Sequence, residues 1–327
     1  MKKYLTLFLS ALMFLSSCSP AIIPSESVEN ATLTVTETKE EGKEAKTKEE
    51  ELVVNQPNPE NDGVLNILII GNSASTGWPD ELNGLLKEAG IKAQIYTVYY
   101  SGCPLSNHWS WLQLGRNNYR LRHHKQSGGV KDDTEVGLDF CLKKRNWDII
   151  SLQQSFHSTL EKGFDYDTFH DRNSFYAGEL YDYIKARYPK SQLVWFQTWA
   201  YNVGFNRENK KIETQEDQDR MHENICISSY RIAEENNVPV IPCSNAWQIA
   251  RANPITGDLT RDQYHDGPEL GGQYLNACVW FEAITGQSCV GNTWRPPALK
   301  ISEEKVAVLQ EAAHRAVTEN QFPFPQK

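Results

Sequence analysis

Short apolar runs alternate with longer stretches of helical periodicity along most of this chain. Five runs of mainly aliphatic and aromatic residues predict buried strands at 64–70, 92–100, 147–154, 191–199 and 237–243. Apolar residues at helical spacing predict helices near 79–89, 134–145, 172–187, 214–236, 269–285 and 302–318. This alternation is typical of a parallel sheet covered on both faces. The expected fold is α/β, a three-layer α/β/α sandwich with a mostly parallel five-stranded sheet, in one domain spanning residues 63–327.

Residues 1–18 have the pattern of a bacterial lipoprotein signal peptide. Two lysines precede an apolar run that is too short to span a bilayer comfortably, and the run ends in Leu15-Ser-Ser-Cys18. By this resemblance, Cys18 becomes the lipidated N-terminus of the mature protein. An ordinary secretory signal with an incidental cysteine is the alternative. Both interpretations predict an extracytoplasmic protein; the first predicts a lipid anchor as its only membrane contact, at a periplasmic or cell-surface face.

Residues 19–62 differ in composition from the rest of the chain. They contain eleven acidic residues, four lysines and no aromatic residue. This composition predicts a disordered acidic tether that lets an anchored domain reach away from the lipid surface. The tether carries −7 of the chain's formal net charge of −9. The remainder therefore has no excess of positive charge that would indicate a nucleic-acid partner, and nothing in the sequence indicates an oligomeric state.

Cysteine usage leaves two interpretations open. Besides Cys18 there are six cysteines: Cys103, Cys141, Cys226, Cys243, Cys278 and Cys289. In an oxidising compartment six cysteines permit up to three disulfides, but several lie in apolar runs and fit small buried thiols equally well. No Cys-x-x-Cys pair occurs, so neither a zinc ribbon nor a thioredoxin-type motif is supported.

The segment ILIIGNSASTG, residues 67–77, supplies the first candidate for chemistry. Gly71 permits a sharp turn that residues carrying a Cβ resist. Ser73 is then expected at the carboxyl end of the first strand, near a helix N-terminus, where open α/β sheets bind their ligands. A solvated serine in an ordinary strand-to-helix turn is the alternative, and this segment alone does not decide between the two.

The second candidate is Asp262-Gln-Tyr-His265, which follows the last predicted strand. A serine becomes a nucleophile only when a base lies beside it and another group orients that base. The spacing of Asp262 and His265 allows one turn to bring the carboxylate to one ring nitrogen and leave the other for Ser73. The two loops should open on the same edge of the sheet. By itself Asp-x-x-His also fits a capped turn, and the pairing with Ser73 strengthens the catalytic interpretation.

Together these motifs resemble the SGNH/GDSL hydrolase superfamily. Its nucleophile follows the first strand, and its acid and base come from a late Asp-x-x-His. The resemblance is closest to a poorly characterised lipoprotein-type group with Gly-Asn-Ser in the first block, and it extends to the SGCPL, HW, LQQS and TWAY motifs at 101–105, 108–109, 152–155 and 198–201. It implies a flavodoxin-like fold with Ser73 as nucleophile, His265 as general base and Asp262 as its orienting acid. The oxyanion hole would use the backbone N–H groups of Ser73 and Gly102.

Two positions depart from the superfamily pattern. Asn72 stands where the family usually has Asp, which alters the hydrogen bonds of the turn. Where the third block should read Gly-x-Asn-Asp, this chain has Ser155-Phe-His157-Ser158. His157 or the neighbouring Gln154 is therefore expected to supply the third oxyanion donor. The loss of one such donor typically lowers the rate about 100- to 1,000-fold.

Aromatic side chains gather in the loops expected after strands two, three and four. Four of these residues are candidates for substrate binding: His108, Trp109, Trp199 and Tyr201. Rings on loops suit stacking on sugars or planar ligands, because a core does not need them there. Capping of hydrophobic edges explains them equally well.

Two other hydrolytic chemistries fit less well. An α/β-hydrolase needs Gly-x-Ser-x-Gly, whereas Ser73 is followed by Ala-Ser. A metal site needs clustered ligands, and His123-His124, between Arg122 and Lys125, is interpreted instead as a solvated or anion-contacting stretch. No glycine-rich phosphate loop of known type follows a strand. No metal or organic cofactor is expected.

The sequence therefore predicts an extracytoplasmic serine esterase. Its expected reaction is removal of O-acetyl or other short O-acyl groups from carbohydrate through an acyl-enzyme, with a small-molecule or glycan ester as substrate. A non-catalytic surface glycan-binding lipoprotein on the same scaffold is the alternative, because a fold does not determine a function.

Overall fold

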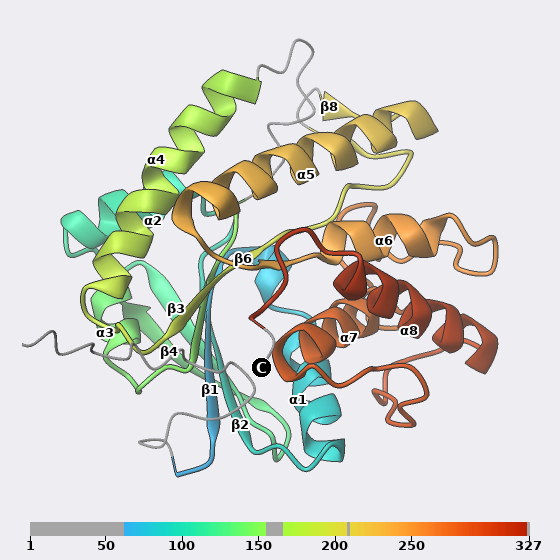
Figure 1. Ribbon diagram of the computed structural model, residues 1–327, viewed down its shortest axis with the longest axis horizontal. Helices are drawn as coiled ribbons and strands as arrows, with labels where there is room; N and C mark the ends of the chain where they lie inside the picture. The colour runs from blue at the N-terminus through green and yellow to red at the C-terminus, as the bar shows by residue number, and fades with distance from the viewer. Residues whose placement is uncertain (1–61, 155–165, 208–209, 326–327) are drawn as a thin grey trace, which may run out of the picture. The chain divides into compact units, whose positions relative to one another are not determined.

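The computed structural model describes residues 62–154, 166–207 and 210–325 (Figure 1). The predicted signal peptide with Cys18, residues 19–61 of the predicted tether, and His157 lie outside the described residues. Within the described ranges, no helix is both long enough and apolar enough to cross a membrane.

A seven-stranded sheet forms the centre of the domain, in the order β4-β3-β2-β1-β5-β6-β9. The strands are β1 Leu65–Gly71, β2 Ala93–Tyr99, β3 Tyr119–His124, β4 Val130–Val136, β5 Ile149–Leu152, β6 Gln192–Phe196 and β9 Val240–Ile241. β2, β1, β5, β6 and β9 are parallel. The predicted α/β class with a mostly parallel sheet is thus confirmed, and this order of the parallel strands is the flavodoxin-like one.

Helices cover both faces of this sheet (Figure 1). They are α1 Pro79–Glu88, α2 Leu105–Gln113, α3 Leu138–Leu142, α4 Tyr166–Lys185, α5 Gln215–Asn236, α6 Cys243–Arg251, α7 Gly272–Thr285 and α8 Glu303–Thr318. Alternate residues of β1 point to opposite faces, as a strand requires. Ile67 and Ile69 pack in the core cluster formed with α1, α6, α7 and α8, whereas Leu68 and Ile70 pack in the cluster formed with α2 to α5. The result is the predicted three-layer arrangement.

The antiparallel hairpin β3–β4 was not predicted. The sequence indicated a loop in this region and a helix near 134–145. β4 is largely exposed at the edge of the sheet, so no apolar run marks it. In β3, two arginines alternate with the core residues Tyr119 and Leu121, and two histidines follow. The interpretation of His123-His124 as a solvated stretch is wrong: His123 stacks on Tyr96, and His124 is fully buried.

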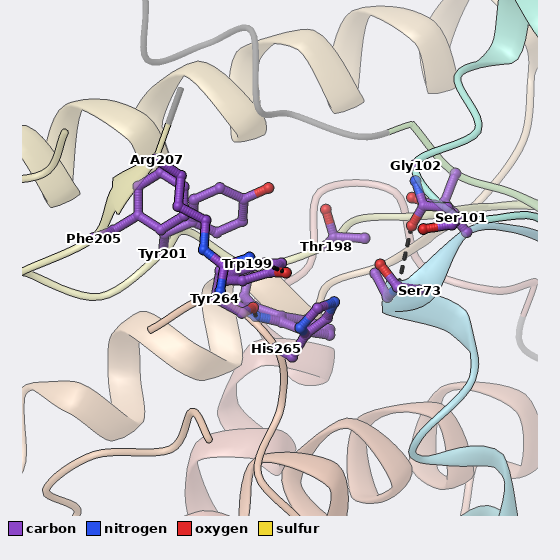
Figure 2. Close-up of a pocket in the computed structure, with 13 residues that line it drawn as sticks. Ser73, Ser101, Gly102, Thr198, Trp199, Tyr201, Phe205, Arg207, Tyr264 and His265 are labelled. Carbon is purple, nitrogen blue, oxygen red and sulfur yellow. Dashed lines mark hydrogen bonds between the residues drawn. The ribbon is translucent and has the colours of Figure 1, made fainter. Parts of the chain in front are cut away.

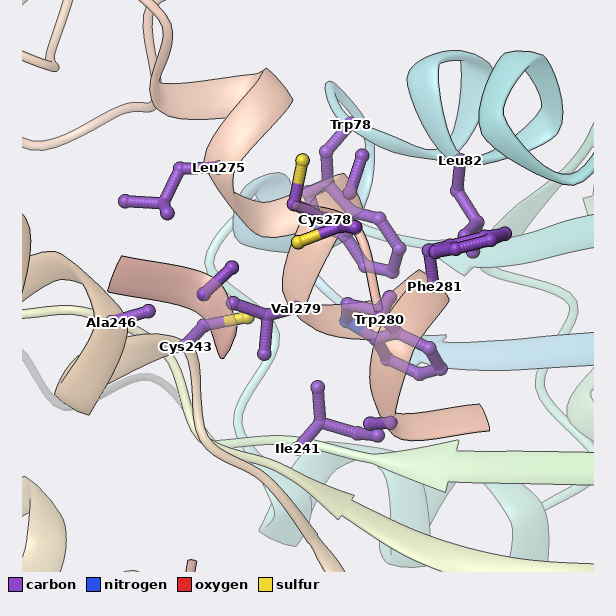
Figure 3. Packing of buried hydrophobic residues seen from close by; sticks show 14 of the residues in the cluster. Trp78, Leu82, Ile241, Cys243, Ala246, Leu275, Cys278, Val279, Trp280 and Phe281 are labelled. Carbon is purple, nitrogen blue, oxygen red and sulfur yellow. The ribbon is translucent and has the colours of Figure 1, made fainter. Parts of the chain in front are cut away.

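Trp78 anchors the segment that follows β1. Its ring stacks on Trp280 of α7 at a centroid distance of 4.7 Å and meets Phe196 of β6 edge-on at 5.3 Å. Figure 3 shows Trp78 and Trp280 within the apolar cluster between α1 and α7. The indole N–H also donates to the Ala74 carbonyl at 2.9 Å. One buried side chain thus ties the turn around Ser73 to the helical layer beneath it.

Two helical glycines predict opposite responses to alanine. At Gly84 in α1 an added Cβ would lie 1.9 Å from Trp294 Cζ2, whereas at Gly178 in α4 the nearest atom, Asn236 Oδ1, is 3.6 Å away. Alanine is favoured over glycine in a helix by about 1 kcal/mol, but overpacking costs about 1–3 kcal/mol. Gly178→Ala should therefore raise the thermal midpoint by about 2–4 °C, and Gly84→Ala should lower it. Thermal melts beside wild type measure both shifts, and a rise in both variants would contradict this packing.

Candidate active site

A cavity of about 440 Å³ opens at the carboxyl ends of β1, β2, β5 and β6. The order of the parallel strands reverses between β1 and β5, and open α/β sheets bind ligands at such a point. The lining residues come from the segments that follow these strands and from the Asp262–His265 loop: Asn72, Ser73, Ala74, Ser101, Gly102, Gln153, Thr198, Trp199, Tyr201, Phe205, Arg207, Tyr264 and His265.

Ser73 lies in a single 3₁₀ turn, Ser73–Ser75, directly after β1. Asn72 caps this turn, because its Oδ1 accepts a hydrogen bond from the Ala74 N–H at 3.1 Å. The Asn72 amide nitrogen donates to the Cys103 carbonyl at 3.4 Å. An ionised aspartate has no proton to give there, so the departure at this position creates a link between the Ser73 turn and the turn at 100–103.

Two backbone N–H groups next to Ser73 are available to a ligand. Figure 2 shows Ser73 beside Ser101 and Gly102. In the described part of the chain, neither the Ser73 nor the Gly102 N–H donates a hydrogen bond to protein. Gly102 has a φ of +62°, which residues with a Cβ rarely adopt, so glycine is favoured here by conformation. Paired free donors of this kind suit an oxyanion.

The predicted contact between Asp262 and His265 is present. Asp262 Oδ2 lies 2.8 Å from His265 Nδ1, and Asp262 Oδ1 accepts the His265 backbone N–H at 2.8 Å. The loop is held from the β6 side, because Trp199 Nε1 donates to the Tyr264 carbonyl at 2.8 Å. The Arg261 N–H donates to the His265 carbonyl at 3.0 Å and closes the loop.

The charge on Asp262 determines which nitrogen of His265 can act as a base. Burial tends to raise the pKa of the Asp262 carboxyl group, but hydrogen bonds from the His265 ring and backbone outweigh it and hold the pKa below its usual range. The carboxylate is therefore ionised at neutral pH. In a neutral His265 the proton then lies on Nδ1, and Nε2 remains able to accept one.

Ser73 and His265 line the same cavity from different segments (Figure 2). Within the described residues, no hydrogen bond joins the Ser73 hydroxyl to the His265 ring. Catalytic hydrogen bonds are often long without substrate and tighten when it binds, so this arrangement is compatible with a nucleophile and its base.

Gln153, rather than Gln154, lines the cavity. The Gln153 side chain is fully buried, and neither its Oε1 nor its Nε2 has a partner among the described residues. Gln154 is committed elsewhere: its Oε1 accepts the Leu105 N–H at 3.1 Å, and its Nε2 donates to Asn173. Gln154, one of the two expected third donors, therefore does not line the cavity, whereas Gln153 does; His157, the other expected donor, lies outside the described residues.

His108 and Trp109 do not line the cavity, contrary to expectation. Both belong to α2, which was predicted as a loop. His108 is fully buried, its Nδ1 lies 2.8 Å from the Tyr119 hydroxyl, and burial lowers its pKa to about 3. Trp109 packs against the core cluster on that face of the sheet. Trp109 thus fits the alternative of covering a hydrophobic surface, whereas His108 is a buried core residue.

Trp199 and Tyr201 do line the cavity, although Trp199 is only 2% exposed and stacks on Trp247 at 4.7 Å. Sequence reasoning missed four further lining residues with chemistry of their own: Gln153, Phe205, Arg207 and Tyr264. Tyr264 lies inside the Asp-x-x-His motif, so its position beside His265 was a usable signal. No sequence signal marked Phe205 or Arg207, because only the fold brings their segment to the cavity.

Two buried carboxyl groups lie behind the His265 loop. Burial raises the pKa of Glu81 to about 8, and the nearby Asp266 adds to the rise. Burial also raises the pKa of Asp266 to about 7, although the Asn276 side chain donates to it at 3.3 Å. Both groups are therefore substantially protonated in the folded protein at neutral pH.

The described residues contain no group of three or more His, Cys, Asp or Glu side chains that could hold a metal ion. The six cysteines of the described chain are free thiols; five are buried and Cys226 is partly exposed.

Comparison with known families and structures gives one family. A model described as "Domain of unknown function (DUF4886)" matches residues 66–316. A crystal structure of a DUF4886 family protein from Bacteroides uniformis shares 28% identity with this chain at a TM-score of 0.69, covering 78% of this chain and 95% of that one.

Two further structures are less similar to this chain. A proposed SGNH hydrolase from Slackia heliotrinireducens is 16% identical, with a TM-score of 0.44 and coverage of 67% and 98%. A catalytic mutant of Axe2, an acetylxylan esterase from Geobacillus stearothermophilus, is 13% identical, with a TM-score of 0.44 and coverage of 67% and 94%. No curated protein matches the chain.

Replacing Asn72 by aspartate should destabilise the protein in a pH-dependent way. At pH 7 the ionised carboxylate cannot donate to the Cys103 carbonyl, and an unsatisfied buried group costs about 1–3 kcal/mol. At about pH 4 a protonated carboxyl can donate, so the deficit should shrink. Asn72→Ala, which loses the donor at every pH, is the control. Thermal unfolding at both pH values measures the effect, and equal pH dependence of the two variants would contradict this role.

Glu81 should make the protein less stable as the pH rises. Its folded-state pKa of about 8 exceeds the ordinary glutamate value of 4.5, which we take for the unfolded state. Between these values the unfolded state binds fewer protons, so the free energy of unfolding falls as the pH rises. Glu81→Gln should therefore gain stability relative to wild type from pH 5 to pH 8, by on the order of a few kcal/mol. Glu88→Gln, at an exposed position of the same helix, should show no such trend. Denaturant unfolding from pH 5 to pH 8 measures the effect. If the free energy of unfolding of both variants changed with pH as that of wild type does, the assignment to Glu81 would be refuted.

Proposed function

We propose, from the premise that this chain belongs to the DUF4886 family of domains of unknown function, that it is a serine esterase with an SGNH-type site. One observation carries the proposal. An imidazole held 2.8 Å from an ionised carboxylate lines the same cavity as a serine at the carboxyl end of β1. This is the combination that activates a hydroxyl nucleophile.

In the first half of the reaction, His265 Nε2 takes the proton from Ser73 Oγ as Oγ attacks the ester carbonyl carbon. The negative charge on the carbonyl oxygen is stabilised by the backbone N–H groups of Ser73 and Gly102 and by the amide nitrogen of Gln153. The C–O bond to the alcohol then breaks, and His265 returns its proton to the departing oxygen. An acyl group remains on Ser73.

In the second half, a water molecule gives a proton to His265 and attacks the acyl carbon. The same donors stabilise the second oxyanion. The bond to Ser73 Oγ breaks, His265 returns the proton to Oγ, and the carboxylic acid leaves. Asp262 stays ionised throughout and stabilises the imidazolium that forms at each step.

The lining of the cavity favours a short acyl group on a sugar. Around Ser73 the described lining is small and polar, with Asn72, Ser101, Gly102, Gln153 and Thr198, and these residues form no apolar channel for a long chain. The aromatic residues Tyr201 and Phe205 lie at the other end, and Tyr264 lies between the two ends beside His265 (Figure 2). Such rings suit the apolar face of a sugar, and an O-acetyl carbohydrate fits both ends. We place the reaction outside the cytoplasm, on the pattern of residues 1–18.

Labelling with a fluorophosphonate tests the nucleophile directly. Intact mass should show one adduct on the wild-type domain and none on Ser73→Ala, because only an activated serine reacts with this reagent. Ser127→Ala, at an exposed turn position, is the matched control and should label like wild type. With 4-nitrophenyl acetate, Ser73→Ala and His265→Ala should each lose about 10³-fold or more in kcat.

Absence of an adduct on wild type, or an adduct that peptide mapping places on Ser101, would overturn the proposal. Absence of an adduct would favour the non-catalytic glycan-binding alternative, which predicts that Ser73→Ala leaves glycan binding intact. An adduct on Ser101 would instead indicate a different nucleophile.

A further inference from the structure

Arg207 brings a positive charge to the cavity, and among the described residues that line it no side chain is acidic. The residue is exposed and belongs to the short strand β7, Asn206–Arg207. Its Nη1 donates to the Tyr264 hydroxyl at 2.7 Å, and its guanidinium carbon lies 4.5 Å from the centre of the Tyr264 ring. Arginine in such a stacked position is pre-organised for an anion.

Arg207 forms no ion pair with an acidic side chain in the described part of the chain. The protein as a whole carries a formal charge of −9 at neutral pH. Most of that charge lies in residues 19–62, so the rest of the chain repels a negatively charged substrate only weakly, and this guanidinium is a cationic group of the cavity that can attract it.

The position of Arg207 shows which part of a substrate it would meet. Tyr264 directly precedes His265, and the two rings are 3.8 Å apart. Figure 2 shows Arg207, Phe205 and Tyr201 at the end of the cavity away from Ser73 and Gly102, with Tyr264 and His265 between the two ends. His265 must protonate the departing alcohol oxygen, so the alcohol part lies over His265 and Tyr264, whereas the acyl group lies toward Ser73.

We infer that Arg207 binds a carboxylate on the alcohol part of the substrate, so that the preferred substrates are O-acyl esters of acidic sugars such as uronic acids. This inference rests on the proposed esterase function and adds its substrate class. The guanidinium would receive the sugar carboxylate while the rings of Tyr201 and Tyr264 border the sugar. A charge-assisted hydrogen bond of this kind favours the acidic substrate over a neutral one by about 10- to 100-fold.

The test compares kcat/KM for three esters: the O-acetyl methyl glycoside of glucuronic acid, the matching O-acetyl methyl glucoside, and 4-nitrophenyl acetate. Wild type should prefer the acidic sugar about 10-fold or more. Arg207→Gln should lose about 10- to 100-fold on the acidic sugar, mainly through KM, and change little on the other two. Arg207→Lys should recover part of the loss. The acidic-sugar rate in wild type should also fall with added salt.

Arg187→Gln is the matched control. Arg187 also stacks on a tyrosine, Tyr183, at 3.5 Å, and also bonds to that residue, but it lies outside the cavity. It should leave all three rates unchanged. If Arg207 only held Tyr264 in place, the result would differ. Arg207→Gln would then loosen Tyr264 and slow the hydrolysis of all three esters alike.

Failure of the inference and failure of the proposed function give different results. Hydrolysis of 4-nitrophenyl acetate without a preference for the acidic sugar, or an equal loss on all esters in Arg207→Gln, would overturn the assignment of Arg207 alone. A preference for a succinyl ester of the neutral sugar over its acetyl ester would place the carboxylate on the acyl side and also overturn it. No hydrolysis of any ester, together with no fluorophosphonate adduct, would overturn both proposals.

Discussion

The packing of Trp78 against α7 is the contact on which the candidate site depends. Its indole N–H holds the Ala74 carbonyl, and its ring stacks on Trp280 in the helix that begins soon after His265. The turn and the loop also approach closely at Gly77, where an added Cβ would lie 2.2 Å from Gln273 Nε2 and 3.1 Å from Asp266 Oδ1. A hydrophobic stack and a missing side chain thus hold together the segments that carry the nucleophile and the base.

The parts of the fold that could be predicted are those whose physical cause is visible in a short stretch of the sequence. The strands that became β1, β2, β5 and β6 are buried on both faces and therefore read as continuous apolar runs. Asp262 and His265 are three residues apart, so their contact needs only one turn. Ser73 was predicted because it follows a strand whose carboxyl end faces the ligand-binding edge, and Gly102 because the resemblance to SGNH/GDSL hydrolases implies it.

The wrong or missing predictions concern residues whose placement depends on a one-residue shift of register or on a segment distant in the sequence. Gln153 and Gln154 both follow β5, and successive side chains leave a strand on opposite sides, so a shift of one residue determines which enters the cavity. His108 was assigned to a loop, but the helical turn of α2 directs it into the core beside Tyr119. Arg207 reaches the cavity from a segment whose composition indicates nothing, and its role appears only once Tyr264 is placed beside it.

A second pair in this protein shows why the carboxylate behind His265 matters. Cys226 Sγ lies 3.7 Å from His222 Nε2, a separation that resembles a thiol nucleophile and its base. Burial raises the pKa of the Cys226 thiol to about 12 and lowers that of His222 to about 4, so both stay neutral at pH 7. His222 Nδ1 lies 2.9 Å from the Ser244 hydroxyl and 3.8 Å from Cys226 Sγ, whereas His265 Nδ1 meets an ionised carboxylate. Asp219 favours the charged form of His222, but burial and Arg251 oppose it, and among the described residues no carboxylate bonds to this ring. His265 differs in the direct contact with Asp262, which stabilises an imidazolium while a bond is made or broken.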